Sequence, residues 1–256
     1  MKSSLLLPSL KIPLHKKCKI VGFHPANIWA LNKSSGILTH PNSGKLSSTA
    51  LLQSQYDQKN ECYRWKDKMG NWQSLYLVHR LDSPTSGLLL TTTDYDIASQ
   101  LKDAFHKKEV KKTYLAVVSS NGKPIRKCWE DNLEKKQMNG KVRVVAGRSG
   151  HSATTYVSIK NRKHTKIGEL LLLEMKPKTG RTHQLRVQCA KRKMPILGDR
   201  TYGDFSLNRK FSHIFKESRL FLHSAGIAIK IKNNQGSMID WKVESSTPDE
   251  FSNLFD

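Results

Sequence analysis

The order of apolar and polar residues predicts a chain of short strands with few helices between them. Strand patterns occur at residues 28–40, where a Ser-Ser-Gly turn divides two strands, and at residues 111–118. Residues 153–161 and 168–177 are two further strands that we expect to pair, and residues 219–232 form one long strand or two. Because few helices separate these strands, we predict an α+β fold with a mixed, mostly antiparallel central sheet and flanking helices.

One helix is predicted from its periodicity and its end signals. Ile97, Leu101 and Phe105 repeat every four residues, as on the buried face of a helix. Asp94 precedes them and is a good N-cap, and Lys107 near the end is a cation that suits the helix dipole.

Two other segments give weaker helical signals. Residues 180–193 predict a helix that begins near Thr182, a plausible cap, with Leu185 on its buried side. Residues 41–75 are polar and read as irregular, apart from a weak helical pattern at Thr49–Tyr56.

A candidate reactive group lies in LVHRLDSPTSGLLLTTTD, residues 77–94, where polar residues interrupt an apolar run. Apolar neighbours such as Leu81 and Leu88–Leu90 would partly desolvate Asp82, which is costly without a cationic partner. The alternative is that Asp-Ser-Pro-Thr is an ordinary turn capped by its carboxylate. The residues alone leave both interpretations open.

Two neighbours of Asp82 also have two interpretations each. Arg80 either forms a surface ion pair or inserts its planar guanidinium into a nucleic-acid helix where a base has left. His79 is either a general base or a histidine satisfied by backbone contacts.

A second polar cluster is KTGRTHQLR, residues 178–186. Arg181 and Arg186 at the start of a predicted helix indicate phosphate binding, or one arginine that keeps a catalytic carboxylate ionised. A solvated basic face is the simpler alternative, but it does not explain the Gly-Arg-Thr turn. Tyr114, within KKTYLAVV, is either a half-buried packing residue or a ring that stacks on a base.

Charge narrows the partner. The 256 residues include 44 Lys and Arg against 21 Asp and Glu, a net charge of +23, which indicates a polyanionic partner. Lysines cluster in residues 102–112, and residues 160–193 carry eleven basic and two acidic residues. Nucleic acid is preferred over an anionic membrane surface, since no apolar run approaches the ~20 residues of a membrane span.

The cysteines and the N-terminal segment indicate a cytoplasmic protein. The four cysteines are scattered without a CxxC pair, so neither a zinc ribbon nor a disulfide framework is expected. The apolar run near the N-terminus is too short for a signal peptide. Residues 1–56 lack acids, as organelle transit peptides do, but they also lack arginine.

Six segments in order resemble the RluA-type family of RNA pseudouridine synthases, namely NKSSG, HRLDSPTSG, KKTYLAVV, GRTHQLRVQCA, LGDRTYG and RLFLHSAGIAI. The resemblance implies a pseudouridine synthase fold, with an N-terminal extension at 1–19 and a catalytic domain at 20–256. Too few residues precede Asn32 for the small N-terminal RNA-binding domain that some members carry, so we expect the catalytic core alone.

The resemblance also implies roles for single residues. Asp82 matches the catalytic aspartate, Arg181 the arginine paired with it, and Tyr114 the tyrosine that stacks on the uracil and can assist at carbon 5. Arg80 matches the residue that fills the gap left by the flipped nucleotide, and Leu185 an apolar wall near the base.

His79, Lys33 and Arg186 complete the predicted substrate-binding set. The sequence departs from the family pattern at Ser34, where proline is usual, and at Gln188 and Ser224, where histidine and alanine are common. These departures bear on substrate choice rather than on the chemistry.

The implied reaction breaks the N-glycosidic bond of uridine, turns the uracil and joins carbon 5 to the same sugar. No atoms leave, so neither a cofactor nor a metal is expected, and one carboxylate suffices where hydrolysis commonly uses two. Whether Asp82 attacks the anomeric carbon or removes a sugar proton stays open. The uridine must leave its helix, at a cost of a few kcal/mol.

The expected partner is structured RNA, either tRNA or rRNA, with no membrane and no obligatory protein partner, and the chain is expected to be a monomer. A second hypothesis is a non-catalytic basic RNA-binding or ribosome-assembly protein. A metal-dependent nuclease built on Asp94 and Asp96 ranks last, because a helix cap already explains Asp94.

Overall fold

The computed structural model describes residues 10–41, 48–120, 122–138, 141–233 and 236–256, which fall into two compact units. The first unit comprises Met1–Val110 and Gly226–Ser245, and the second comprises Lys111–Ala225 and Ser246–Asp256. The predicted boundary between residues 19 and 20 stays a prediction, and the first strand begins at Lys19.

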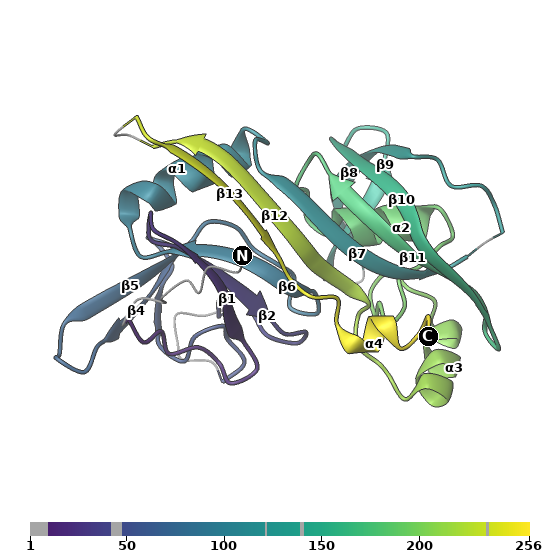
Figure 1. The fold of residues 1–256 in the computed structure, drawn as a ribbon. Coiled ribbons are helices and arrows are strands. Elements are labelled where there is room, and N and C mark those ends of the chain that lie inside the picture. Colours follow the sequence, from purple (N-terminus) through teal and green to yellow (C-terminus); the bar gives the residue numbers. More distant parts are fainter. Residues whose placement is uncertain (1–9, 42–47, 121, 139–140, 234–235) are drawn as a thin grey trace. The chain divides into compact units, whose positions relative to one another are not determined.

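The described part of the first unit is built from antiparallel strands and helix α1 (Figure 1). Strands β3 to β6 follow one another in the sheet, β2 pairs with β6, β1 pairs with β2, and residues 226–232 of β12 pair with β13. The elements are β1 (Lys19–His24), β2 (Ile28–Lys33), β3 (Gln55–Asp57), β4 (Cys62–Lys66), β5 (Trp72–Leu77), β6 (Ser86–Thr92), α1 (Tyr95–His106), β12 (Leu222–Lys232) and β13 (Met238–Glu244). The first four residues of β12, 222–225, belong to the second unit.

The second unit has the strand order β7-β11-β10-β8-β9, and each of these neighbours is antiparallel to the next. Its elements are β7 (Lys111–Ser119), β8 (Cys128–Met138), β9 (Lys141–Gly147), β10 (His151–Thr165), β11 (Gly168–Pro177), α2 (Gln184–Lys191), α3 (Phe205–Phe215) and α4 (Asp249–Ser252). The α+β class with a mostly antiparallel sheet is therefore confirmed.

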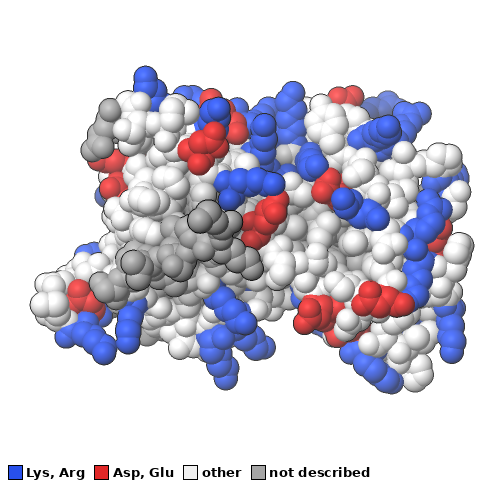
Figure 2. Space-filling view, in the orientation of Figure 1, with Lys and Arg blue, Asp and Glu red and all other residues white. Residues whose placement is uncertain are grey.

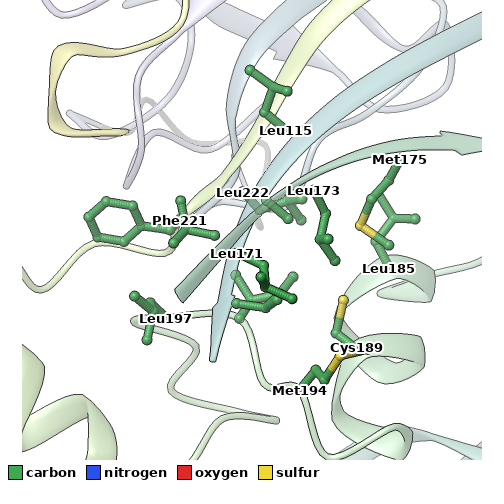
Figure 3. Close-up of a cluster of buried hydrophobic side chains, with 14 of the residues drawn as sticks. Leu115, Leu171, Leu173, Met175, Leu185, Cys189, Met194, Leu197, Phe221 and Leu222 are labelled. Carbon is green, nitrogen blue, oxygen red and sulfur yellow. The ribbon is translucent and has the colours of Figure 1, made fainter. Parts of the chain in front are cut away.

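Helix α2 is held on the second unit by an apolar cluster. Figure 3 shows Leu185 and Cys189 of α2 beside Met175 of β11, and all three side chains are buried. Burying a side chain such as Leu185 stabilises the fold by about 1.5–3 kcal/mol. The residues that follow the Gly-Arg-Thr turn are thus fixed to the sheet by their apolar side chains.

Several predicted elements are confirmed. Helix α1 begins behind Asp94, whose carboxylate accepts a hydrogen bond from the Ile97 N–H at 3.0 Å. The strands predicted at 111–118, 153–161 and 168–177 are β7, β10 and β11, and the last two pair as expected. Residues 222–232 form one strand rather than two.

The helix indicated by the weak pattern at Thr49–Tyr56 does not form, so this prediction was wrong. Leu51 donates its N–H to the Leu38 carbonyl at 2.8 Å and accepts from the His15 N–H at 2.9 Å. Tertiary backbone pairing therefore replaces local helix formation. The second strand of the predicted 28–40 hairpin is reduced to an isolated bridge between Leu38 and Ala50.

Residues 41–75 were predicted to be irregular, but three strands lie between Gln55 and Leu77. The buried side chains of β4 alternate with charged ones, because Tyr63 and Trp65 point into the unit while Arg64 and Lys66 are exposed. Because charged residues occupy alternate positions of this half-buried strand, the segment was predicted to be polar and irregular.

Helix α2 begins at Gln184 rather than near Thr182, because His183 occupies the N-cap with a left-handed backbone (φ 52°) and no capping side-chain bond. Within the described residues, no helix has the length and apolarity needed to cross a bilayer.

We predict that the second unit loses stability between pH 6.5 and about pH 4. Burial, followed by the charge of Arg219, lowers the pKa of His223 to about 4 from its ordinary 6.5. The unfolded chain therefore binds a proton that the folded chain excludes, and stability falls by about 3 kcal/mol as the pH falls through this window.

Urea unfolding at several pH values measures this effect. His223→Gln should flatten the pH dependence, whereas the same change at His213, which is exposed on α3, should leave it as in the wild type. An unchanged slope in the His223 variant would contradict the assignment.

Candidate active site

Asp82 lies in the loop that joins β5 to β6 in the first unit. The Thr85 N–H donates to the Asp82 backbone carbonyl at 3.0 Å, so Asp-Ser-Pro-Thr forms a turn. Asp82 is half-buried, with Leu81 buried beside it and Leu88–Leu90 fully buried in β6. The turn thus places a carboxyl group at the edge of an apolar core, which agrees with both interpretations.

A second loop anchors the Asp82 turn. Lys33 is fully buried, and its Nζ donates to the carbonyls of Ile37 at 2.7 Å and Ser83 at 3.0 Å. Gly36, at φ +84°, donates its N–H to the same Ser83 carbonyl at 2.9 Å. The Ser35 hydroxyl donates to the Pro84 carbonyl at 2.8 Å. The Asn-Lys-Ser-Ser-Gly turn thereby holds the two residues that follow Asp82.

Thr39 holds the residue that precedes Asp82. Its Oγ1 donates to the Leu81 carbonyl at 2.8 Å and accepts from the Leu81 N–H at 3.2 Å, and the side chain is buried. The Thr39 carbonyl in turn accepts from the Tyr63 hydroxyl at 2.9 Å. The role of Thr39 was not predicted from the sequence, because its partner Leu81 lies 42 residues away.

His79 and Arg80 differ in exposure. The Nε2 atom of His79 accepts from the Leu90 N–H at 2.9 Å, and the ring stacks on Phe105 with centroids 4.5 Å apart. These contacts match the interpretation of a histidine satisfied by the backbone rather than a general base. Arg80 is exposed, as insertion into RNA would require.

The second unit carries the other predicted catalytic residues. Tyr114 is half-buried on β7, opposite Met175 of β11, and packs against the cluster that contains Leu185. Arg181 is exposed, and its Nε donates to the Ser152 carbonyl at 3.3 Å. Because Asp82 belongs to the first unit and Arg181 to the second, their pairing stays a prediction.

Two glutamines on one face of α2 organise the turn that carries Arg181. The Gln184 Oε1 accepts from the Arg181 N–H at 3.1 Å and from the Thr179 hydroxyl at 2.7 Å. The Gln184 Nε2 donates to Thr155 Oγ1 at 2.9 Å, and the Thr155 hydroxyl donates to Gln188 Oε1 at 2.6 Å. A continuous chain of buried hydrogen bonds thus runs from Arg181 into the unit.

Asp131 on β8 ends this chain of hydrogen bonds. It accepts from Gln188 Nε2 at 2.9 Å, from Lys191 at 2.6 Å and from Arg192 at 2.8 Å. Burial opposes the charged form, but these donors outweigh it and hold the pKa of Asp131 below its ordinary value. The i, i+4 spacing of Gln184 and Gln188 was the available sequence signal, since it places both amides on one helix face.

Arg186 forms a buried ion pair instead of lying open to phosphate. Its Nε and Nη2 donate to the two carboxylate oxygens of Asp199, both at 2.8 Å, and only 5% of the Arg186 side chain is exposed. The guanidinium also lies over the Tyr202 ring, 5.1 Å from its centroid. We therefore leave Arg186 out of the proposed RNA contacts, and the same holds for the buried Lys33.

The comparisons with known proteins identify the family. The family model of RNA pseudouridylate synthase matches residues 27–191. Ribosomal large subunit pseudouridine synthase C of Rickettsia bellii is 33% identical, over 90% of this chain and 70% of its own. tRNA pseudouridine synthase C of Yersinia pestis is 32% identical, over 79% of this chain and 77% of its own. The chain belongs to the RNA pseudouridylate synthase family, which confirms the predicted resemblance.

The match has a limited extent. Ribosomal large subunit pseudouridine synthase D of Borreliella burgdorferi is 32% identical over 83% of this chain, but the chain spans only 61% of that relative's length. Among solved structures, human RNA pseudouridylate synthase domain containing 1 covers 96% of this chain, with 89% of its own length, a TM-score of 0.66 and 21% identity. That likeness shows the pseudouridine synthase fold.

We predict that Thr39→Val loosens the backbone beside Asp82. Valine has nearly the same shape but leaves the buried N–H and carbonyl of Leu81 without their partner, which should cost about 2 kcal/mol of unfolding free energy. The Leu81 amide should also exchange its hydrogen faster. Thr39→Ser keeps the hydroxyl and is the matched control, and equal stability of the two variants would contradict this role.

A second prediction concerns Gln188. Gln188→Leu removes the acceptor for Thr155 and a donor to Asp131, and we expect a loss of about 2 kcal/mol in urea unfolding. Histidine offers one acceptor and one donor, so Gln188→His should retain stability to within about 1 kcal/mol. If the histidine variant is no more stable than the leucine variant, the predicted role of the Gln188 hydrogen bonds is contradicted.

Proposed function

We propose that the protein is an RNA pseudouridine synthase that isomerises a specific uridine in structured RNA. The observation that carries the proposal is the anchored turn that holds the half-buried Asp82 at an apolar edge, with Arg80 exposed two residues before it. Family membership supports the same reaction.

In the proposed reaction the target uridine is extruded from its helix, and the exposed Arg80 guanidinium fills the gap. Asp82 assists cleavage of the glycosidic bond, either as a nucleophile at the anomeric carbon or as a base toward a sugar proton. The freed uracil turns while Tyr114 stacks on it and Leu185 walls the pocket. Carbon 5 then bonds to the anomeric carbon, which releases Asp82 in the nucleophilic route, and carbon 5 loses its proton while N1 takes one up. Arg181 is the proposed cationic partner of Asp82, and exclusion of water keeps the base from being lost.

RNA is the proposed partner for electrostatic reasons. Lys and Arg side chains are spread over the face in Figure 2, and the chain carries a net charge of +23. Relatives are named for the ribosomal large subunit and for tRNA, so we propose rRNA or tRNA as the substrate class. We further propose a cytoplasmic monomer that acts without a cofactor, a membrane or an obligatory protein partner.

We predict that Asp82→Asn lowers pseudouridine formation at least about 10²-fold, because the amide is neither a base nor a nucleophile of comparable strength. RNA affinity should stay within a few-fold, since the side-chain shape is kept. Nucleoside chromatography of digested RNA measures the product, and filter binding measures affinity.

The matched control is Asp96→Asn, which removes an exposed carboxylate in the first turn of α1. It should retain full activity. If the wild-type chain binds RNA but converts no uridine in tRNA or rRNA, the non-catalytic RNA-binding alternative is favoured instead.

A further inference from the structure

The β4–β5 hairpin of the first unit has two unlike faces. Its inner face is apolar, because Tyr63, Trp65 and Leu75 are buried. On its outer face Lys66 lies directly opposite Trp72 in the register, and Arg64 lies two residues before Lys66. All three outer side chains are exposed, and 53% of Trp72 is accessible to solvent.

The two cations hold the exposed indole from the same strand. The Arg64 guanidinium carbon lies 5.0 Å from the Trp72 ring centroid, and the Lys66 Nζ lies 5.3 Å from it. Contacts of this kind orient a ring that would otherwise sample several rotamers. An aromatic surface and two positive charges therefore come together at one place on the outer face of the hairpin.

The turn beyond these residues is fixed by Asp67. Its Oδ1 accepts from the N–H groups of Met69 at 2.9 Å and Asn71 at 3.0 Å, and its Oδ2 accepts from Gln73 Nε2 at 2.8 Å. The acid in the turn is thus engaged by backbone and amide donors. Figure 2, read with Figure 1, shows Lys and Arg side chains at this end of the hairpin.

From these contacts we infer that the outer face of the β4–β5 hairpin binds an unpaired nucleotide of the RNA, with the base stacked on Trp72 and phosphates on Arg64 and Lys66. Aromatic rings beside cations bind single-stranded nucleic acid in this way, because every base has a π-face and every nucleotide a charge. A protein partner would be expected to meet an apolar surround, whereas the ring here is flanked by cations.

The outer face of the β4–β5 hairpin, here called the Trp72 platform, consists of Trp72, Arg64 and Lys66. Its distance from Arg80 fits an RNA that continues beyond the target uridine. Trp72 precedes Arg80 by eight residues in the same unit, so their Cα atoms lie at most ~29 Å apart. A folded RNA can span that distance. The identity of the bound RNA as the substrate rests on the proposed function, but RNA binding by the platform does not.

The test compares two labelled RNA probes, a stem-loop with an unpaired loop and a blunt duplex of equal length, by fluorescence anisotropy in the Asp82→Asn background. Trp72→Ala should weaken stem-loop binding at least about five-fold and leave duplex binding unchanged. Trp72→Phe keeps an aromatic face and should stay within about two-fold. Because no product is formed, a failed synthase assay does not affect this result.

Two controls sharpen the outcome. Phe205→Ala removes a comparably exposed ring on α3, 64% accessible, and should change neither affinity. A plot of log affinity against log salt concentration has a negative slope. Arg64→Gln and Lys66→Gln should each make that slope less steep by about 0.7. The inference is overturned if Trp72→Ala binds the stem-loop like its parent, loses affinity equally for the duplex, or is matched by Trp72→Phe.

Discussion

Two side chains from one short segment hold the backbone on either side of Asp82. Lys33 donates to the Ser83 carbonyl, and Thr39 satisfies both backbone groups of Leu81. A loop between strands would otherwise sample many conformations, at a cost of about 1–2 kcal/mol per residue to fix. These buried bonds fix the backbone on both sides of Asp82. In the proposed function, preorganisation of this kind would let the single Asp82 carboxylate act on a uridine that must itself be rearranged.

The second unit applies the same principle to Arg181. Its backbone N–H is tied through Gln184, Thr155 and Gln188 to Asp131, which is itself held by two cations. Arg80 and Arg181 are exposed and Asp82 is half-buried, while the residues that position them are buried. Gln188, a departure from the usual histidine, supplies the acceptor and donor that this place requires.

Much of the fold was predictable, because elements such as α1 and the β10–β11 pair carry an unbroken pattern and clear end signals. Strand β4 was not, since Arg64 and Lys66 on one face mask the apolar Tyr63 and Trp65 on the other. The turn at Asp82 could be predicted from the local sequence Asp-Ser-Pro-Thr. The contacts of Thr39 and Asp131 join residues 42 or more positions apart, so local pattern gives no access to them. Lys33 and Arg186 were predicted to bind substrate, but both are buried and bond to other parts of the protein. Their burial depends on the tertiary fold, so the local sequence does not reveal it.

The central claim is that this chain isomerises uridine in a stable cellular RNA. Mapping pseudouridines in tRNA and rRNA from cells that lack the gene tests it most directly. The proposed activity predicts that one position or a small set of positions reverts to uridine and is restored by the wild-type chain. Unchanged maps in every tRNA and rRNA would contradict the claim and leave a protein that binds RNA without modifying it.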